Sequence, residues 1–320
     1  MNKTRRARRG FTIAELSVVL AITGLLLALA VPALQSARDA ARRSACAQNL
    51  VRLQASLHRH EAAHGVFPAG VRHDSGPIVE QESGFHPSWT VDILPYVDQQ
   101  ATYNRVDRGA SDYSDDDYTE DNVSLRQTPI AVLRCSLASA AAPRSSYAGV
   151  HHDQESPIND DNHGLLFLNS RIGYDDIPDG LAHTLLLGEK RGGPNDLGWM
   201  SGTRATLRNT GARINRTERD AAPPLGFRTT NLLYDDFDSA RDASRQDEPS
   251  RPAPHVVGEF VGGFGSRHVG GAFFAYADGR VQFLADGADL QLLRALAHRA
   301  DGGPENNALV VQPERKPTNF

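Results

Sequence analysis

A single carboxylate at the start of a long apolar segment is a strong candidate for chemistry in this sequence. Glu15 follows a basic leader, and the next charged residue is Arg38. A carboxylate at mid-bilayer costs roughly 2.5–3.5 kcal/mol, so such a residue usually has a partner or a function. Cleavage after Gly10 would free the α-amino group of Phe11, a cation four positions from Glu15. We therefore expect Glu15 to pair with an amino terminus, within one chain or between neighbouring chains.

The segment that follows Glu15 has the length of a membrane-spanning helix. Residues 16–37 are 22 positions without a charge, and about 20 apolar residues cross the ~30 Å hydrocarbon layer. Five Lys and Arg residues in positions 1–10 favour a cytoplasmic N-terminus. Two alternatives are a secretory signal with the box Ala28-Leu29-Ala30 and a twin-arginine signal at Arg8-Arg9. An ordinary signal has a shorter apolar core of about 7–15 residues, which favours the anchor.

His268 and Asp278 are a second candidate for chemistry, in the spacing H-x9-D-G that Gly279 completes. Histidine is the side chain best suited to proton transfer near neutral pH, so the two could form a general acid–base dyad. The alternative is that His268 hydrogen-bonds the turn of a hairpin and fixes its shape. We favour this second interpretation, because no other catalytic group accompanies the dyad in the sequence.

The segment around Asp278-Gly279 is predicted to be a β-hairpin. Residues 272–277 and 280–284 alternate in polarity on either side of it, and Asp-Gly suits the centre of a two-residue type I′ turn. This register predicts two cross-strand pairs on one apolar face: Tyr276 with Val281, and Phe274 with Phe283.

The sequence contains two cysteines, Cys46 and Cys135. In an oxidising compartment an even pair can close a disulfide, which would tie the long helix to the head. The alternative is two separate buried thiols. Neither cysteine belongs to a C-x-x-C motif, so structural zinc and redox catalysis are not expected.

Two further groups could bind a metal. The acidic loop 107–121 offers hard oxygen ligands for Ca²⁺ from Asp112, Asp115 and Asp117. It lacks the glycine of an EF-hand loop, so a solvated loop is the favoured interpretation. The second group is His151-His152-Asp153 with His163, but loop histidines are more often solvated than ligating. We therefore expect no cofactor, with Ca²⁺ as the alternative.

The elements that position these residues follow from periodicity. One helix is expected from about Phe11 to His64, with an apolar stripe at Leu50, Leu53 and Leu57 and a stop at Gly65. Further elements are a helix at 88–100, strands at 130–133, 146–150, 164–168 and 184–188, and a helix at 289–300. Residues 192–254 are expected to form long connections. The predicted divisions are a leader (1–10), a transmembrane helix (11–37), a helical stalk (38–65), a head (66–305) and a tail (306–320).

The overall charge limits the partners. The formal net charge is −5, and loss of the five leader cations would take it to about −10. An acidic mature chain argues against nucleic acid as a partner.

The N-terminal pattern resembles a known class. Gly10-Phe11-Thr12 with Glu15, then an apolar helix containing Pro32, is similar to the start of type IV prepilins and type II secretion pseudopilins. The resemblance implies cleavage after Gly10 by a prepilin peptidase, N-methylation of Phe11, and contact of Glu15 with a neighbour's amino terminus during assembly. It implies other pilin-like subunits and membrane lipid as partners. It also implies a single-pass protein of the inner (cytoplasmic) membrane with a cytoplasmic N-terminus and a periplasmic head.

Together with the H-x9-D-G spacing, this pattern resembles a bacterial family of prepilin-like proteins of unknown function that end in an H-x9-D-G domain. The similarity runs from about Arg8 to Gly303. Other matching pieces are Cys46-Ala47-Gln48-Asn49-Leu50, Ile93-Leu94-Pro95-Tyr96, Ser146-Tyr147-Ala148-Gly149, Asp179-Gly180 followed by Thr184-Leu185, Gly188-Glu189 and Gly263-Phe264-Gly265-Ser266-Arg267-His268. Where that family usually reads Phe-Leu-Cys-Pro-Ser-Asp, this chain has Leu133-Arg134-Cys135-Ser136-Leu137, without the Pro and Asp.

We therefore expect an α+β fold, with a long N-terminal helix, transmembrane in its first half, packed on an antiparallel β-sheet head. The favoured function is a membrane-anchored prepilin- or pseudopilin-like subunit that assembles through this helix into a type II secretion or type IV pilus-like structure. The alternative is a membrane-displayed envelope binding module whose head captures a ligand without fibre assembly. We expect no enzymatic activity.

Overall fold

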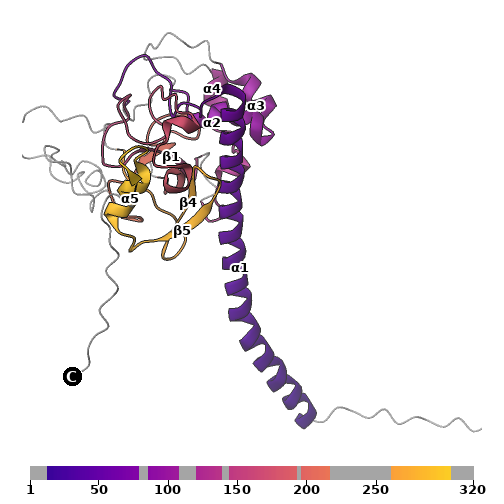
Figure 1. Ribbon diagram of the computed structural model, residues 1–320. Helices are drawn as coiled ribbons and strands as arrows, with labels where there is room; N and C mark the ends of the chain where they lie inside the picture. Colours follow the sequence, from indigo (N-terminus) through magenta and orange to yellow (C-terminus); the bar gives the residue numbers. More distant parts are fainter. Residues whose placement is uncertain are drawn as a thin grey trace, which may run out of the picture. The chain divides into compact units, whose positions relative to one another are not determined.

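The computed structural model describes residues 13–78, 86–107, 120–138, 144–192, 196–216 and 261–303. The chain divides into two compact units, residues 1–45 and residues 46–320, the second of which is the head. The longest element, α1 (Ile13–His64), contributes residues to both units (Figure 1).

In the first unit, α1 exposes its apolar side chains. Every large apolar residue from Ile13 to Leu34 is at least half exposed. Among the described residues, α1 is the one helix long and apolar enough to cross a membrane. Ser17 and Ser36 donate their hydroxyls to carbonyls of the same helix at 2.9 Å, so these two polar groups need no water. Pro32 lies inside the helix without ending it.

The last part of α1 belongs to the head unit. The predicted apolar stripe is confirmed, because three leucines are fully buried: Leu50, Leu53 and Leu57. Between them, the Gln54 side-chain amide donates to the carbonyl of Tyr276. The helix ends at His64, as expected, since Gly65 adopts a φ of 76° and donates its N–H to the Glu61 carbonyl at 2.7 Å.

The head contains a five-stranded sheet in the order β3-β1-β2-β4-β5. The strands are β1 (Tyr147–His152), β2 (Leu185–Glu189), β3 (Leu207–Asn209), β4 (Gly271–Tyr276) and β5 (Val281–Ala285). Three neighbouring pairs are antiparallel, and β1 with β3 is parallel. The α+β class is therefore confirmed, with a mixed sheet where an antiparallel one was expected. The difference is β3, a three-residue strand inside the region predicted to hold only connections.

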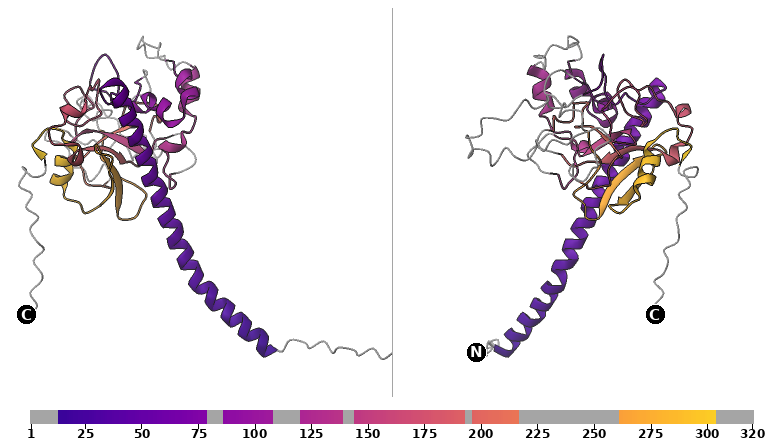
Figure 2. Two further views of the ribbon diagram at one scale, coloured as in Figure 1. Left: turned by 45° about the vertical axis from the view of Figure 1, so that its right-hand side comes forward. Right: turned by 90° about the vertical axis from the view of Figure 1, so that its left-hand side faces the viewer.

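Helices cover both faces of the sheet. Ala275 of β4 belongs to the same buried cluster as Leu53 of α1. The preceding residue, Phe274, clusters with Leu293 of α5 (Leu290–Ala297). Successive strand residues point to opposite faces, so the head part of α1 and α5 lie on opposite sides of the sheet. Figure 2 shows α5 beside the β4–β5 hairpin, both in gold.

The helix predicted over 88–100 is wrong as a single element. The chain instead forms three short helices: α2 (Trp89–Asp92), the 3-10 turn η1 (Leu94–Val97) and α3 (Gln100–Arg105). Pro95 lacks an N–H for a continuous helix. Asp98 adopts a left-handed φ of 61°, which ends η1. Other short helices are α4 (Glu120–Arg126), η3 (Tyr174–Asp176) and η4 (Leu181–His183).

Two of the four predicted internal strands are wrong. Residues 131–133 form a 3-10 turn, η2 (Ala131–Leu133). Residues 164–168 are buried but do not form a strand, because the N–H groups of Leu165 and Leu166 both bond the carbonyl of Val150. A short apolar run reports burial without fixing the pairing of its backbone. The strands expected at 146–150 and 184–188 are confirmed as β1 and β2.

The hairpin is present in a register one residue away from the predicted one. Its pairs include Ala275 with Val281, and Phe273 with Phe283. The Tyr276 N–H donates to the Arg280 carbonyl at 2.9 Å, so the loop has three residues and ends on Gly279 with a φ of 105°. A three-residue loop with glycine in this position is a common hairpin connection. The extra loop residue pairs Phe283 with Phe273 instead of Phe274, so Phe283 lies on the face opposite Phe274.

Candidate functional site

The start of α1 is the first candidate site. Glu15 lies in the first turn of the helix, where a carboxylate is favoured by the helix dipole. Gly10 and Phe11 lie outside the described residues. Processing after Gly10, methylation of Phe11 and pairing of Glu15 with an amino terminus therefore stay predictions.

The structure separates His268 from Asp278. The two residues flank β4, whose six residues span roughly 17–20 Å at ~3.3 Å per residue. Asp278 is exposed, and its Oδ1 accepts the Arg280 N–H within the turn at 2.9 Å. The His268–Asp278 dyad is therefore wrong. The favoured alternative is also wrong, because His268 lies at the end of β4 away from the turn.

His268 lies instead in a buried cluster with Glu189 and a disulfide. Its Nε2 lies 3.3 Å from Glu189 Oε1 and 3.5 Å from Cys135 Sγ. The side chains of His268 and Glu189 are only 1% and 2% exposed. Glu189 Oε2 accepts the Phe273 N–H at 2.8 Å, so the sheet itself fixes the carboxylate. Burial of an acid beside a base suits an internal ion pair or hydrogen bond.

The disulfide joins Cys46 on α1 to Cys135, with Cα atoms 5.0 Å apart and a sequence separation of 89. Cys46 makes polar contacts besides the disulfide. The Ser136 N–H donates to Cys46 Sγ at 3.3 Å, and the Tyr147 hydroxyl donates to the Cys46 carbonyl at 3.1 Å. The sulfur atoms thus lie between a backbone N–H on one side and the His268 ring on the other.

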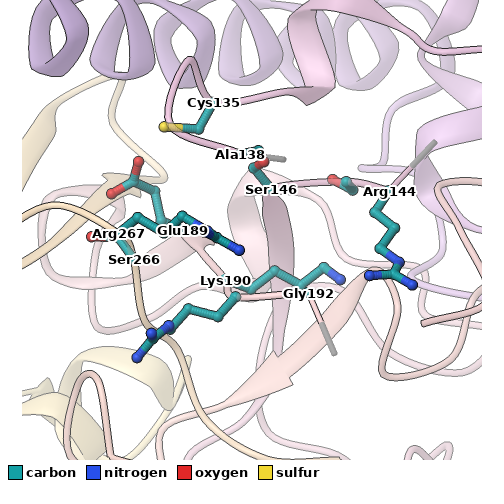
Figure 3. A pocket seen from close by; sticks show the side chains of 11 residues that line it. Cys135, Ala138, Arg144, Ser146, Glu189, Lys190, Gly192, Ser266 and Arg267 are labelled. Carbon is teal, nitrogen blue, oxygen red and sulfur yellow. The ribbon is translucent and has the colours of Figure 1, made fainter. Parts of the chain in front are cut away.

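Cys135 and Glu189 line a small pocket (Figure 3). Four cationic residues share its lining: Arg144, Lys190, Arg191 and Arg267. Lys190 forms a buried ion pair with Asp196. The pocket has a volume of ≈ 60 Å³. It has room for several water molecules or an ion.

A second cluster joins three of the histidine-segment residues. Asp153 Oδ1 lies 2.7 Å from His152 Nδ1 and 2.8 Å from His163 Nδ1. Burial acts to raise the pKa of Asp153, but hydrogen bonds and charge from His152, with the bond from His163, outweigh it and hold this pKa below its ordinary value. The three residues could offer two nitrogens and one oxygen to a divalent metal.

His151 does not join that group. Its ring is fully buried, and Nδ1 lies 3.0 Å from Asn162 Oδ1. Burial lowers the pKa of His151 to about 3 despite this bond. The ring is therefore a neutral core histidine at physiological pH. The calcium candidates Asp112, Asp115 and Asp117 lie outside the described residues, so that prediction stays as it was.

Sequence reasoning missed the role of Glu189. The residue was noted within Gly188-Glu189, but no local pattern linked it to a histidine about 80 positions away. One signal in the sequence was available. Glu189 directly follows the strongly apolar run 184–188, and a carboxylate in a buried strand needs a partner, so its position predicts a buried contact.

Comparisons with known proteins match a motif at the N-terminus and a longer region of the chain. Residues 5–31 match the prokaryotic N-terminal methylation motif. A segment of 64 residues is 34% identical to the type II secretion system core protein G of Klebsiella michiganensis. This segment is 20% of the chain, and it spans 45% of that protein, less than half of its length. No solved structure matches.

With the methylation motif, the apolar helix α1 indicates a single-pass membrane anchor, and the similarity to protein G supports a pseudopilin-like subunit. Residues 35–291 match the family described as "Protein of unknown function (DUF1559)". This match covers most of the head as well as the end of the anchor. The chain therefore belongs to this family and carries a prepilin-type N-terminus.

Proposed function

We propose that this chain is a prepilin- or pseudopilin-like subunit that is processed after Gly10 and assembles through α1 into a type II secretion or type IV pilus-like structure. Prepilin peptidase would cut the chain, and other pilin-like subunits would be its partners. No catalysis is part of this role. The observation that carries the proposal is the methylation motif at residues 5–31, which overlaps the unburied apolar start of α1 with Glu15 in its first turn.

The exposed side chains of α1 support assembly within a membrane. Large apolar residues from Ile13 to Leu34 surround the helix on every side. In lipid such a surface is stable for a single helix, and it can also pack against identical helices without unfolding the head. Glu15 is the acidic residue of this surface, so a neighbour's amino terminus would give it an opposite charge in hydrocarbon.

The leader supports one orientation. Its five cations precede the apolar segment, and cationic flanks stay on the cytoplasmic side. The chain would therefore lie in the inner membrane, with the head on the periplasmic side. A disulfide in the head agrees with this compartment, because disulfides persist where conditions are oxidising.

The test compares three proteins expressed in a bacterium that has a prepilin peptidase: wild type, Glu15→Gln and Glu15→Asp. Intact mass of the membrane-extracted chain reports processing and methylation. Surface crosslinking with a reagent that does not react with cysteine reports assembly. We expect all three to begin at methylated Phe11, because processing precedes assembly, and we expect crosslinked oligomers to be lost in Glu15→Gln and retained in Glu15→Asp.

Two results would overturn the proposal. A mature chain that begins at Val31 would mean signal-peptidase cleavage and loss of the anchor. Correct processing with the same crosslinking pattern in all three proteins would mean that the anchor only displays the head, as in an envelope binding module.

A further inference from the structure

The cluster around the disulfide brings four metal-ligand residues together from distant parts of the chain. Cys46 comes from α1, Cys135 from the loop after η2, Glu189 from the end of β2 and His268 from the segment before β4. One possible ligand atom from each lies within 4.8 Å of all the others. We propose that reduction of the Cys46–Cys135 disulfide converts this cluster into a tetrahedral zinc-class metal site.

The distances suit such a site. Zinc binds sulfur at ~2.3 Å and nitrogen or oxygen at ~2.0–2.2 Å, so neighbouring donors in a tetrahedral site lie roughly 3.3–3.8 Å apart. His268 Nε2 already lies 3.3 Å from Glu189 Oε1 and 3.5 Å from Cys135 Sγ. Once reduced, the two sulfurs would separate to about 3.8 Å, and the remaining donor pairs already lie within 4.8 Å of one another. The sequence did not predict zinc, because neither cysteine belongs to a C-x-x-C motif. The four ligands come together only in the folded chain.

One ligand atom has no hydrogen bond. Among the described residues, Glu189 Oε1 is a buried oxygen without a hydrogen-bond partner, although it faces His268 Nε2. A buried acceptor left without a hydrogen bond is unfavourable, and more so when it is charged. A bound cation at the centre of the four residues would satisfy this oxygen.

The surroundings of the four ligands resemble the second layer of a metal site. Ligating groups in metal sites are usually oriented by hydrogen bonds from outside. The Ser136 N–H donates to Cys46 Sγ at 3.3 Å, and the Phe273 N–H donates to Glu189 Oε2 at 2.8 Å. Both bonds would persist with a metal bound and would offset negative charge on the ligand atoms. The four residues are at most 8% exposed, which is typical of a closed structural site.

The chemistry balances. A phosphine reductant breaks the Sγ–Sγ bond and takes an oxygen atom from water, leaving two thiols and a phosphine oxide. A divalent metal then displaces one proton from each thiol. With two thiolates, one carboxylate and a neutral imidazole, the complex of the divalent metal carries one net negative charge.

The experiment uses the full chain in detergent micelles, with Co²⁺ as a spectroscopic probe followed by Zn²⁺ competition. Reduced protein should bind one Co²⁺ per chain with the intense thiolate-to-cobalt absorption of a tetrahedral site, and Zn²⁺ should displace it. The oxidised protein has the same sequence but no thiolate, so it should lack this absorption. All samples carry Asp153→Asn, which removes the His152–Asp153–His163 group as a competing site in both redox states.

The variants Glu189→Gln and His268→Gln test whether the fold supplies the other two ligands. Each should weaken Co²⁺ binding by the reduced protein at least tenfold. Affinity that is unchanged in both variants would overturn the proposal, because two cysteines of an unfolded chain would bind in the same way. Absence of the thiolate-to-cobalt absorption in the reduced protein would also overturn it.

Folding of the reduced chain is followed by near-ultraviolet circular dichroism of Trp89 and Trp199, both buried in the head. A native signal before metal addition, or a signal that is lost on reduction and regained with Zn²⁺, supports the site. A signal that is lost and not regained at saturating Zn²⁺ contradicts it.

Discussion

Leu25 and Leu53 lie in the same helix, yet their side chains are 63% and 0% exposed. The first belongs to the anchor unit and the second to the head unit. Around Leu25 the helix surface is apolar on all sides. Around Leu53 the helix buries polar groups as well, including Gln54 and Ser56, which donate hydrogen bonds to carbonyls.

This contrast shows how one helix can serve two solvents. Helix-forming residues fill both parts, so propensity does not distinguish them. Lipid requires that a helix satisfy its polar groups by itself, as Ser17 and Ser36 do. A protein core admits a polar side chain if another element offers a partner, as Tyr276 does for Gln54. Buried polar residues therefore distinguish the head part of α1 from its anchor part.

The largest expected effect comes from the disulfide that fastens the head part of α1. Closing a loop with a sequence separation of 89 stabilises by about 4–5 kcal/mol in the chain-entropy treatment. We expect the Cys46→Ser, Cys135→Ser double variant to lose about this much free energy of unfolding. Urea unfolding in detergent, followed by tryptophan fluorescence, measures it. An unchanged midpoint would mean that packing alone holds α1 to the head.

The comparison of the two leucines can be tested directly. Leu53→Ala leaves a cavity in the head core, which typically costs about 2–5 kcal/mol. Leu25→Ala removes the same atoms from an exposed position, so the head should unfold at the same urea concentration as wild type. Equal losses in both variants would contradict the assignment of these residues to different environments.

Acid should destabilise the head through its buried histidines. The pKa of His151 is lowered by burial to about 3, whereas the unfolded chain has the ordinary value near 6.5. The unfolded state therefore binds a proton that the folded state does not, and stability present above pH 6.5 is lost as pH falls toward 3. The loss is about 1.4 kcal/mol per pH unit.

The variant His151→Gln isolates this effect, since it removes the titrating ring. Burial also lowers the pKa of His58, His60 and His298, so wild type and variant should both lose stability in acid. We expect the unfolding free energy to fall less steeply between pH 6 and pH 4 in the variant. The difference in slope should correspond to about one bound proton, or about 1.4 kcal/mol per pH unit. Identical slopes would mean that His151 is protonated in the folded head.

The smallest effect concerns the hairpin that contacts Gln54 of α1. Gly279 has a φ of 105°, which side chains with a Cβ rarely adopt, so Gly279→Ala should cost about 1–2 kcal/mol. A Cβ there would meet only Gln54 Nε2 at 3.9 Å, so strain rather than a clash is the cause. Gly287→Ala is the matched control, because its φ is not in this region and open space surrounds it. Equal melting temperatures for the two variants would contradict the three-residue loop.

Elements with a strong local pattern were predictable from the sequence. The end of α1 at His64 follows from Gly65, and the place of the hairpin follows from alternation around Asp278-Gly279. Its exact register does not, because two-residue and three-residue loops fit the same Asp-Gly pair. Only the backbone of Tyr276 and Arg280 decides between them.

Features that depend on distant partners were not predictable. β3 is three residues long and gains its strand character only by pairing with β1. The partnership of Glu189 with His268 joins positions about 80 residues apart across two strands. The sequence suggested Asp278 or the hairpin turn as the partner of His268, because both are near along the chain, but β4 holds His268 and the turn at opposite ends.

The disulfide also has a mechanical consequence. Cys46 is the first residue of the head unit, so a pull on the anchor reaches the covalent bond to Cys135 as soon as it enters the head. The chain between the two cysteines, with a contour length of roughly 300 Å, cannot extend while the bond is intact. Under tension the oxidised head would therefore lengthen far less than the reduced one, and α2, α3 and α4, all within this segment, would be shielded from the force.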